Sequence, residues 1–221
     1  MKAVIFDFNG TLFNDTDFHI EAWQKYMQKK FGIELTFEQT KAGFIGANNP
    51  TILRNYFGED RFTIEELEQM SIEKEAQYRE VVCSYPEQMH LMDGAPELFD
   101  YLKEHNIPFA LATASILDNI IFYMNELNLA SWFTLDRIVY DEGKLASKPD
   151  PAFYIEAMRR LEMDPADCII VEDSPAGIEA AVNAKAGRVI AIDRTAPRDW
   201  LESNENIHAL IHDFHGFEKF L

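Results

Sequence analysis

Short apolar runs alternate with helix-like patterns over most of this chain. The run at 3–6 is continuous and apolar, and similar runs recur at 108–112, 138–140, 168–171 and 188–192. Runs of this length are typical of strands that are buried on both faces of a parallel sheet. Apolar residues at helical spacing lie between them. The alternation therefore predicts an α/β protein with a doubly wound parallel sheet.

The stretch 15–85 breaks this alternation. It carries helical patterns, such as the face shared by Phe18 and Ala22, and it has no convincing strand. Because it directly follows the first predicted strand, we expect an inserted helical domain that forms a lid over the carboxyl ends of the strands, where open α/β sheets bind ligands. The predicted domains are a discontinuous core at 1–14 and 86–221 and a helical cap at 15–85.

Candidate chemistry begins at the ends of the first two predicted strands. Asp7 and the turn Asn9-Gly10 follow the first strand, and a carboxylate beside a glycine turn can face a ligand. Asp7 could equally be a loop residue that caps the next helix. Residues 113–115, which are Thr113, Ala114 and Ser115, follow the run at 108–112. Their hydroxyls and amides can donate to phosphate oxygens, although Ser115 could instead cap a helix.

Two further motifs lie later in the chain. Lys148 precedes Pro149 and Pro151, which restrict the backbone that presents it. Its compact cation suits a phosphate oxygen, although a solvated surface lysine before a helix is the alternative. Glu172 and Asp173 follow a strongly apolar strand, and paired acids there suit a hard cation such as Mg²⁺, although two solvated turn residues are the alternative. The four motifs follow one another along the chain: an aspartate, a pair of hydroxyl residues, a lysine and a pair of acids. This order predicts a phosphoryl-transfer site with Asp7 as the nucleophile.

The net charge and the number of cysteines limit the classes of partner and the compartment that we expect for this chain. The formal net charge is -18 and the isoelectric point is near 4.6, so the chain repels nucleic acid and anionic membranes. An anionic substrate therefore needs a metal or a local basic group. Two cysteines form no disulfide framework, and no run approaches the roughly 18 apolar residues of a membrane span. We expect a cytoplasmic monomer or weak dimer that binds a small phosphorylated metabolite.

These motifs resemble those of the haloacid dehalogenase superfamily, in the branch with a helical cap after the first strand. The chain is most similar to the group of β-phosphoglucomutases and phosphoglycolate phosphatases. The resemblance covers essentially the whole chain, and its most specific stretches are Gly-Lys-Leu-Ala-Ser-Lys-Pro-Asp-Pro at 143–151 and Val-Glu-Asp-Ser-Pro-Ala-Gly-Ile-Glu-Ala-Ala at 171–181. It implies a Rossmann-like core with an inserted α-helical cap.

The resemblance also implies roles for individual residues. Asp7 would form an aspartyl-phosphate, and Thr113 and Lys148 would hold the phosphoryl group. A Mg²⁺ ion would be held by Asp7, the backbone carbonyl of Asn9 and Asp173, with Glu172 in or near its shell. The expected function is a Mg²⁺-dependent phosphatase acting on a small phosphorylated metabolite such as a sugar phosphate. A β-phosphoglucomutase-type phosphomutase and a non-catalytic metabolite-binding protein are the alternatives.

Asn9 departs from the family motif, which has a second aspartate at this position. An amide cannot shuttle a proton, and general acid–base catalysis is typically worth roughly 10²–10⁴-fold. Three explanations compete: a natural variant that uses another group, an inactive relative, or a substitution made to trap an intermediate. We favour the natural variant because the surrounding sequence is intact. His19 is the leading substitute acid or base, and an ordinary polar helix residue is the alternative.

The stretch Gly46-Ala47-Asn48-Asn49-Pro50-Thr51 falls where the family has its cap specificity loop. A β-phosphoglucomutase has an arginine, which grips a second phosphate, at the position that is Asn49 here. Its absence favours hydrolysis of a monophosphate over mutase chemistry. Asn48 and Asn49 could contact sugar hydroxyls, or they could cap the helix that starts near Pro50.

Overall fold

The computed structural model describes residues 2–45 and 47–221. The chain divides into two compact units, one made of Met1–Asn14 and His90–Leu221 and the other of Asp15–Met89. The predicted cap at 15–85 falls within the second unit, which extends to Met89. Gly46, which belongs to the predicted cap loop, lies outside the described residues. That the second unit acts as a cap stays a prediction.

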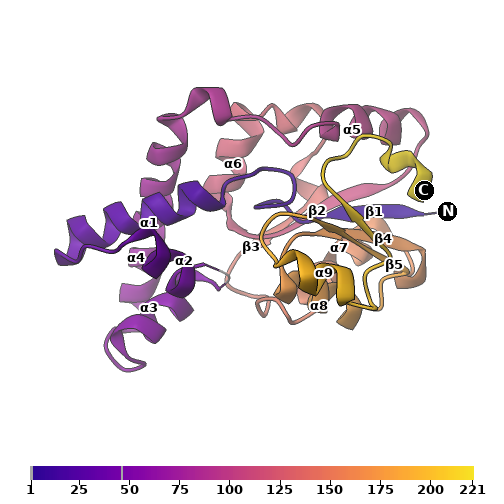
Figure 1. Cartoon of the computed structure of the whole chain (residues 1–221). Coiled ribbons are helices and arrows are strands. Elements are labelled where there is room, and N and C mark those ends of the chain that lie inside the picture. Colours follow the sequence, from indigo (N-terminus) through magenta and orange to yellow (C-terminus); the bar gives the residue numbers. More distant parts are fainter. Residues whose placement is uncertain (1, 46) are drawn as a thin grey trace. The chain divides into compact units, whose positions relative to one another are not determined.

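In the described part of the first unit, six parallel strands form one sheet in the order β3-β2-β1-β4-β5-β6 (Figure 1). The strands are β1 (Ala3–Phe6), β2 (Phe109–Ile116), β3 (Ile138–Asp141), β4 (Cys168–Glu172), β5 (Arg188–Ile192) and β6 (Ala209–Ile211). This order places β1 beside β4, where the chain crosses from one half of the sheet to the other. Ligands of open α/β sheets bind at such a switch point, outside the carboxyl ends of the strands.

The register between β1 and β4 fixes the level of the polar residues that follow them. Phe6 is paired with Val171, and the amide of Asp7 continues the ladder by donating to the carbonyl of Val171 at 3.0 Å. Asp7 therefore lies level with Glu172. All residues of β1 and β4 are buried, which explains why both strands read as continuous apolar runs.

Helices cover both faces of the sheet. Figure 1 shows α5 and α6 on one face and α7 and α8 on the other, as expected for a doubly wound fold. The helices of this unit are α5 (Ala95–Glu104), α6 (Leu117–Glu126), α7 (Ala152–Leu161), α8 (Pro175–Asn183) and α9 (Arg198–Ser203). In one core cluster, Phe153 and Ala157 of α7 are buried together with Ile5 of β1 and Ile170 of β4. The predicted α/β class with a parallel sheet is confirmed.

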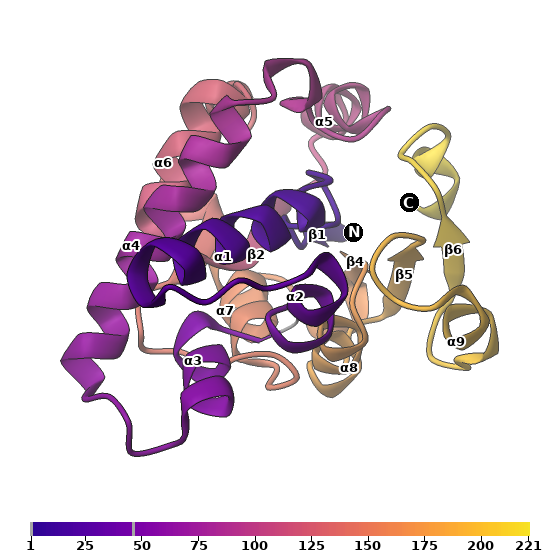
Figure 2. The ribbon, with the colours of Figure 1, turned by 60° about the vertical axis from the view of Figure 1, so that its left-hand side comes forward.

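The second unit is helical (Figure 2). Its helices are α1 (Thr16–Phe31), α2 (Phe37–Gly43), α3 (Asn49–Phe57) and α4 (Ile64–Cys83). A separate core of this unit includes Trp23 and Met27 of α1, Leu53 of α3 and Met70 of α4. The predicted helical insertion after the first strand is therefore confirmed.

Two details of the sheet differ from the prediction. Strand β2 continues to Ile116, so residues 113–115 belong to the strand, whereas the pattern placed them after its end. Strand β6 was not predicted, since it has three residues and two of them are partly exposed. Among the described residues, no helix has the length and apolar character that crossing a membrane requires.

Candidate active site

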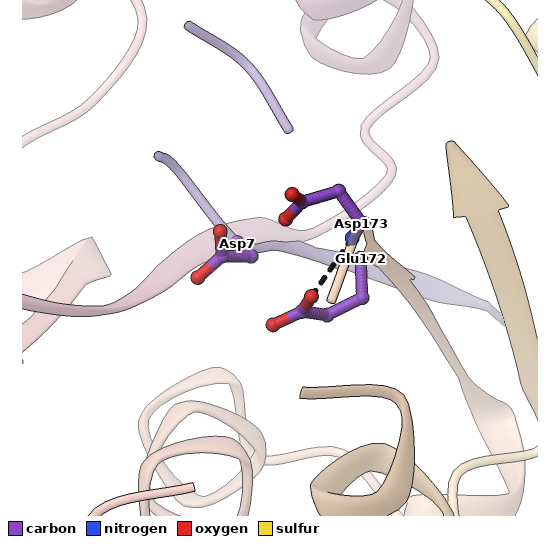
Figure 3. Close-up of side chains that lie close together, drawn as sticks. All are labelled: Asp7, Glu172 and Asp173. Atoms are coloured by element: carbon purple, nitrogen blue, oxygen red, sulfur yellow. Dashed lines mark hydrogen bonds between the residues drawn. The ribbon is translucent and has the colours of Figure 1, made fainter. Parts of the chain in front are cut away.

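Three carboxylates meet at the carboxyl ends of β1 and β4. Asp7 follows β1, Glu172 ends β4 and Asp173 follows it, and Figure 3 shows their side chains gathered together. One carboxylate oxygen from each lies within 4.8 Å of the others. The three residues are 1–7% exposed. The sequence-predicted acids are thus brought into one buried cluster.

A tight turn after β1 holds this cluster together. The carbonyl of Phe8 accepts the backbone N–H groups of residues 11–13 at 2.8–3.2 Å, which folds the chain back on itself. Gly10 has a φ of +78°, and a Cβ there would overlap the carboxylate of Asp173. The hydroxyl of Thr11 donates to Oδ1 of Asp173 at 3.1 Å. The Asn-Gly-Thr turn therefore both leaves room for Asp173 and orients it.

Glu172 serves as an anchor within the cluster. Its Oε1 accepts from Lys148 Nζ at 2.7 Å and from the Tyr154 hydroxyl at 3.0 Å. Its Oε2 accepts from the backbone N–H groups of Asp173 and Ser174, both at 2.8 Å, and from the Ser174 hydroxyl at 3.0 Å. Five donors of the protein therefore hold this carboxylate in place and occupy both of its oxygens.

The start of α8 is shaped around Glu172. Ser174 is the N-cap of α8, and its hydroxyl accepts from the amide of Gly177 at 3.1 Å. A Cβ on Gly177 would overlap the Glu172 carboxylate. The Ser-Pro-Ala-Gly segment therefore does more than start a helix, because it also makes room for the glutamate.

Lys148 points into the cluster. Its Nζ donates to Asp7 Oδ1 at 2.5 Å as well as to Glu172, and it lies 4.8 Å from the centroid of the Tyr154 ring. Burial disfavours the ammonium, but the charges of Asp7 and Glu172 outweigh it and hold the pKa of Lys148 well above its usual value. The alternative of a solvated surface lysine is therefore wrong.

The acids carry more negative charge than Lys148 balances. Burial raises the pKa of Glu172, but the ammonium of Lys148 outweighs this effect and leaves the pKa below its usual value. Burial raises the pKa of Asp173 well above its usual value, and repulsion from Glu172 and Asp7 adds to the increase. Oxygen donors with excess negative charge are the set that Mg²⁺ prefers, so these residues fit a divalent cation.

Asn9 sits among hydroxyl groups. Its Oδ1 accepts from the hydroxyls of Ser115 at 2.6 Å and Thr113 at 3.3 Å, and its Nδ2 donates to the Tyr123 hydroxyl at 3.1 Å. The predicted hydroxyl residues of β2 are thus beside residue 9, with Ala114 exposed between them. The N-cap of α6 is Ile116, and it makes no side-chain cap. The Ser115 hydroxyl contacts Asn9 instead of serving as that cap.

Sequence reasoning missed two tyrosines of the site. Tyr123 is fully buried, with its ring 4.3 Å from that of Phe8, and Tyr154 is fully buried beside Lys148 and Glu172. Both occur in apolar helical patterns, where a tyrosine reads as a core residue. The tyrosines themselves were a signal, because the hydroxyl of a buried tyrosine needs a hydrogen-bond partner and therefore points to nearby polar groups.

His19 lies in a buried polar cluster of the second unit. Its Nδ1 is 2.7 Å from Lys74 Nζ, its Nε2 is 3.4 Å from Asp15 Oδ2, and its ring stacks on Tyr78 with centroids 4.0 Å apart. Because a lysine ammonium only donates, Nδ1 is the acceptor, which places the proton of a neutral ring on Nε2. Both ring nitrogens have partners within this unit.

The two predicted substrate residues of the cap have different surroundings. Asn48 is the N-cap of α3, and its Oδ1 accepts from the amide of Thr51 at 3.0 Å. Asn49 donates from Nδ2 to Glu75 Oε1 at 2.8 Å, and Glu75 also accepts from Lys74 at 2.9 Å. The capping alternative thus holds for Asn48. A substrate contact by either residue stays a prediction.

Comparison with known proteins gives a consistent result. The family model described as haloacid dehalogenase-like hydrolase matches residues 4–191. The β-phosphoglucomutase of Bacillus subtilis is 30% identical over 191 residues, which cover 83% of this chain and 80% of that protein. A phosphorylated carbohydrates phosphatase of Thermotoga maritima is 26% identical over 87% of this chain and 85% of its own length. The crystal structure of a HAD hydrolase of family IA, variant 3, from Entamoeba histolytica superposes with a TM-score of 0.86 at 30% identity, covering 97% of this chain and 94% of that one.

Proposed function

Since the chain belongs to the haloacid dehalogenase-like hydrolases, we propose that it is a Mg²⁺-dependent phosphatase that acts on a small phosphorylated metabolite, with sugar phosphates as the first candidates. One observation carries this proposal. Lys148 Nζ lies 2.5 Å from Asp7 Oδ1, inside a buried cluster of three carboxylates. A nucleophilic carboxylate, a cation for the phosphate and a set of metal ligands are therefore within reach of one phosphoryl group.

Asp7 attacks first in the proposed reaction. One of its carboxylate oxygens bonds to phosphorus while the bond from phosphorus to the leaving oxygen breaks, which gives an aspartyl-phosphate. Lys148 neutralises charge on the phosphoryl oxygens, and Thr113 and Ser115 turn their hydroxyls from Asn9 to those oxygens. Water then attacks phosphorus and releases inorganic phosphate from Asp7.

The metal is the second part of the proposal. When bound, Mg²⁺ would supply positive charge that lowers the repulsion between the phosphate and the carboxylates. Asp7, Asp173 and the backbone carbonyl of Asn9 would hold it. Glu172 would stand beside them and orient Lys148, since five protein donors already engage its carboxylate. Chelation should abolish turnover, and added Mg²⁺ should restore it.

A phosphomutase is the second candidate, because a β-phosphoglucomutase is among the relatives at 30% identity. Such an enzyme transfers the phosphoryl group to a second hydroxyl of a sugar phosphate and holds a second phosphate while doing so. Asn49 stands at the position of the gripping arginine and is bonded to buried Glu75. This pairing of an amide with an acid favours a phosphatase. A non-catalytic binding role is disfavoured by the intact Asp7, Lys148 and Asp173 cluster.

The test is Mg²⁺-dependent turnover of p-nitrophenyl phosphate by the parent chain, Asp7→Ala and Asn9→Asp. We expect measurable turnover in the parent and none in Asp7→Ala. Asn9→Asp should be faster, by up to roughly 10²–10⁴-fold for substrates that need acid–base help. Turnover that survives in Asp7→Ala would exclude Asp7 as the nucleophile. A parent without turnover that gains it in Asn9→Asp would show that Asn9 inactivates the chain.

A further inference from the structure

The amide of Asn9 sets a requirement on the substrate. We propose that the phosphate is carried by an oxygen that can leave as a stable anion, such as an acyl, enol or aryl oxygen or, in a sugar, the anomeric oxygen. Phosphates of primary and secondary alcohols would be poor substrates. This inference rests on the proposed function, because it assumes that Asp7 attacks a phosphate ester.

The reason is the charge that develops on the leaving oxygen. Phosphoryl transfer passes through a loose transition state in which the bond to the leaving group is largely broken. An alcohol oxygen then carries almost a full negative charge and needs a proton, whereas the anion of a stronger acid can depart unaided. A carboxylic acid at position 9 could give that proton, but an amide cannot. The loss therefore falls on substrates with basic leaving groups.

The two hydroxyls of β2 beside Asn9 do not replace the missing acid. Its side chain is held by the hydroxyls of Ser115, Thr113 and Tyr123, at 2.6, 3.3 and 3.1 Å. Serine and threonine hydroxyls are themselves alcohols, so they are no better acids than the leaving group. The Tyr123 side chain is fully buried, and its oxygen accepts from the Asn9 amide.

Two other proton carriers are placed for different work. Lys148 is bonded to Asp7 and therefore lies on the side of the attacking oxygen. In an in-line displacement the leaving oxygen departs on the opposite side of phosphorus. His19 contacts Lys74 and Asp15 through its two ring nitrogens, within the second unit. It can act as an acid only after these contacts break.

The chemical step balances without an added acid. An Asp7 oxygen forms the new bond to phosphorus, and the bond from phosphorus to the leaving oxygen breaks. The leaving group keeps the bonding electron pair, departs as an anion and takes a proton from bulk water afterwards. Water then attacks the phosphorus of the aspartyl-phosphate, and the bond from phosphorus to the Asp7 oxygen breaks. One proton of the water passes to solvent, inorganic phosphate leaves, and the carboxylate of Asp7 is restored.

The test is a series of phosphate esters with decreasing acidity of the leaving group, from p-nitrophenyl through phenyl, whose phenol has a pKa of about 10, to a simple alkyl phosphate. We expect kcat/KM of the parent chain to fall steeply along the series. In Asn9→Asp, kcat/KM should depend less on the leaving group. The ratio of its kcat/KM to that of the parent should grow to roughly 10²–10⁴-fold for the alkyl ester. Asn9→Ala should keep the steep dependence, which separates the missing acid from any effect of the aspartate on folding.

Three results would overturn the inference. The first is a parent whose dependence is as shallow as that of Asn9→Asp. The second is a parent chain whose kcat/KM depends only weakly on the leaving group, together with a His19→Gln variant in which this dependence is steep. That result would identify His19 as the acid. The third is the absence of Asp7-dependent turnover of every ester, including the p-nitrophenyl ester, and this outcome alone would also remove the proposed function.

Discussion

At the residue scale, the charge balance of the site depends on Lys148. Its ammonium bonds to Asp7 and Glu172, and its pKa is held well above the usual value because these charges outweigh burial. We predict that Lys148→Met lowers kcat/KM for p-nitrophenyl phosphate by roughly 10²–10³-fold, since it removes a preorganised charge from the phosphoryl group. Steady-state kinetics with saturating Mg²⁺ measures this loss.

Lys144 offers the matched control for this change. It lies in the same loop with its side chain 75% exposed and pairs with Glu142 at 3.4 Å, so Lys144→Met should leave kcat/KM unchanged. Equal losses in the two variants would mean that the effect comes from the net charge of the chain, and Lys148 would have no special position.

Single residues also mark the limit of what the sequence can predict. Asp7, Lys148, Glu172 and Asp173 were predictable because each belongs to a dense local motif that ends or follows a strand. Tyr123 was not, since it reaches Asn9 across a separation of 114 residues from within an apolar helical pattern. A periodic pattern predicts which face of a helix is buried, but it does not reveal where a phenol hydroxyl finds its partner.

At the element scale, the second unit contains a buried ion pair between neighbours on α4. Lys74 and Glu75 are 1% and 6% exposed, and Glu75 also accepts from Asn49 at the start of α3. Burial raises the pKa of Glu75, but the ammonium of Lys74 and the hydrogen bonds from Asn49 and Lys74 outweigh this effect and bring the pKa to about 2. A buried glutamate that remains ionised at neutral pH thus joins two helices.

Removing this charge should destabilise the fold. Because the pKa of Glu75 is lower in the folded chain, its stabilisation is complete above pH 4.5 and is lost as the pH falls towards 2. The difference corresponds to about 3 kcal/mol. We predict that Glu75→Gln lowers the free energy of unfolding at pH 7 by about that amount, and that the variant loses less stability than the parent between pH 5 and 3. Urea unfolding at several pH values measures both effects.

Glu156 provides the comparison. Its pKa is also lowered to about 2, by hydrogen bonds from Arg159 and Arg160, but its side chain is 23% exposed and its partner Arg159 is 70% exposed. Solvent screens such surface pairs, so Glu156→Gln should cost clearly less than Glu75→Gln. If the two variants were equally destabilised, burial of the Glu75 pair would not be the cause.

The sheet and its helices follow closely from local patterns. Five strands were predictable, because each contains a short apolar run next to a helical pattern. The edge strand β6 was not, since a three-residue strand with partly exposed positions carries almost no periodic signal. Strand β2 was predicted too short because the hydroxyl residues Thr113 and Ser115 resemble the beginning of a loop.

At the scale of the whole molecule, the fold does not by itself decide the reaction. The relatives at comparable identity include a β-phosphoglucomutase and a phosphatase of phosphorylated carbohydrates, and a shared fold supports different chemistries through different site residues. In this chain, Asn49 is the position that favours hydrolysis over phosphoryl transfer to a second hydroxyl. Asn9 is the position that favours a substrate whose leaving oxygen departs as a stable anion. The division into two units was predictable, because a helical stretch interrupts an alternating pattern.

The most direct test is to look for phosphate on Asp7. Since Asn9 cannot activate water, hydrolysis of the aspartyl-phosphate should be slow, and the intermediate should accumulate. The chain is mixed with p-nitrophenyl phosphate and Mg²⁺, quenched in acid and analysed by intact mass and peptide mapping. We predict one added phosphoryl group on the peptide that contains Asp7, and none in Asp7→Asn. Phosphate on another residue, or Mg²⁺-dependent release of p-nitrophenol in Asp7→Asn, would contradict Asp7 as the nucleophile.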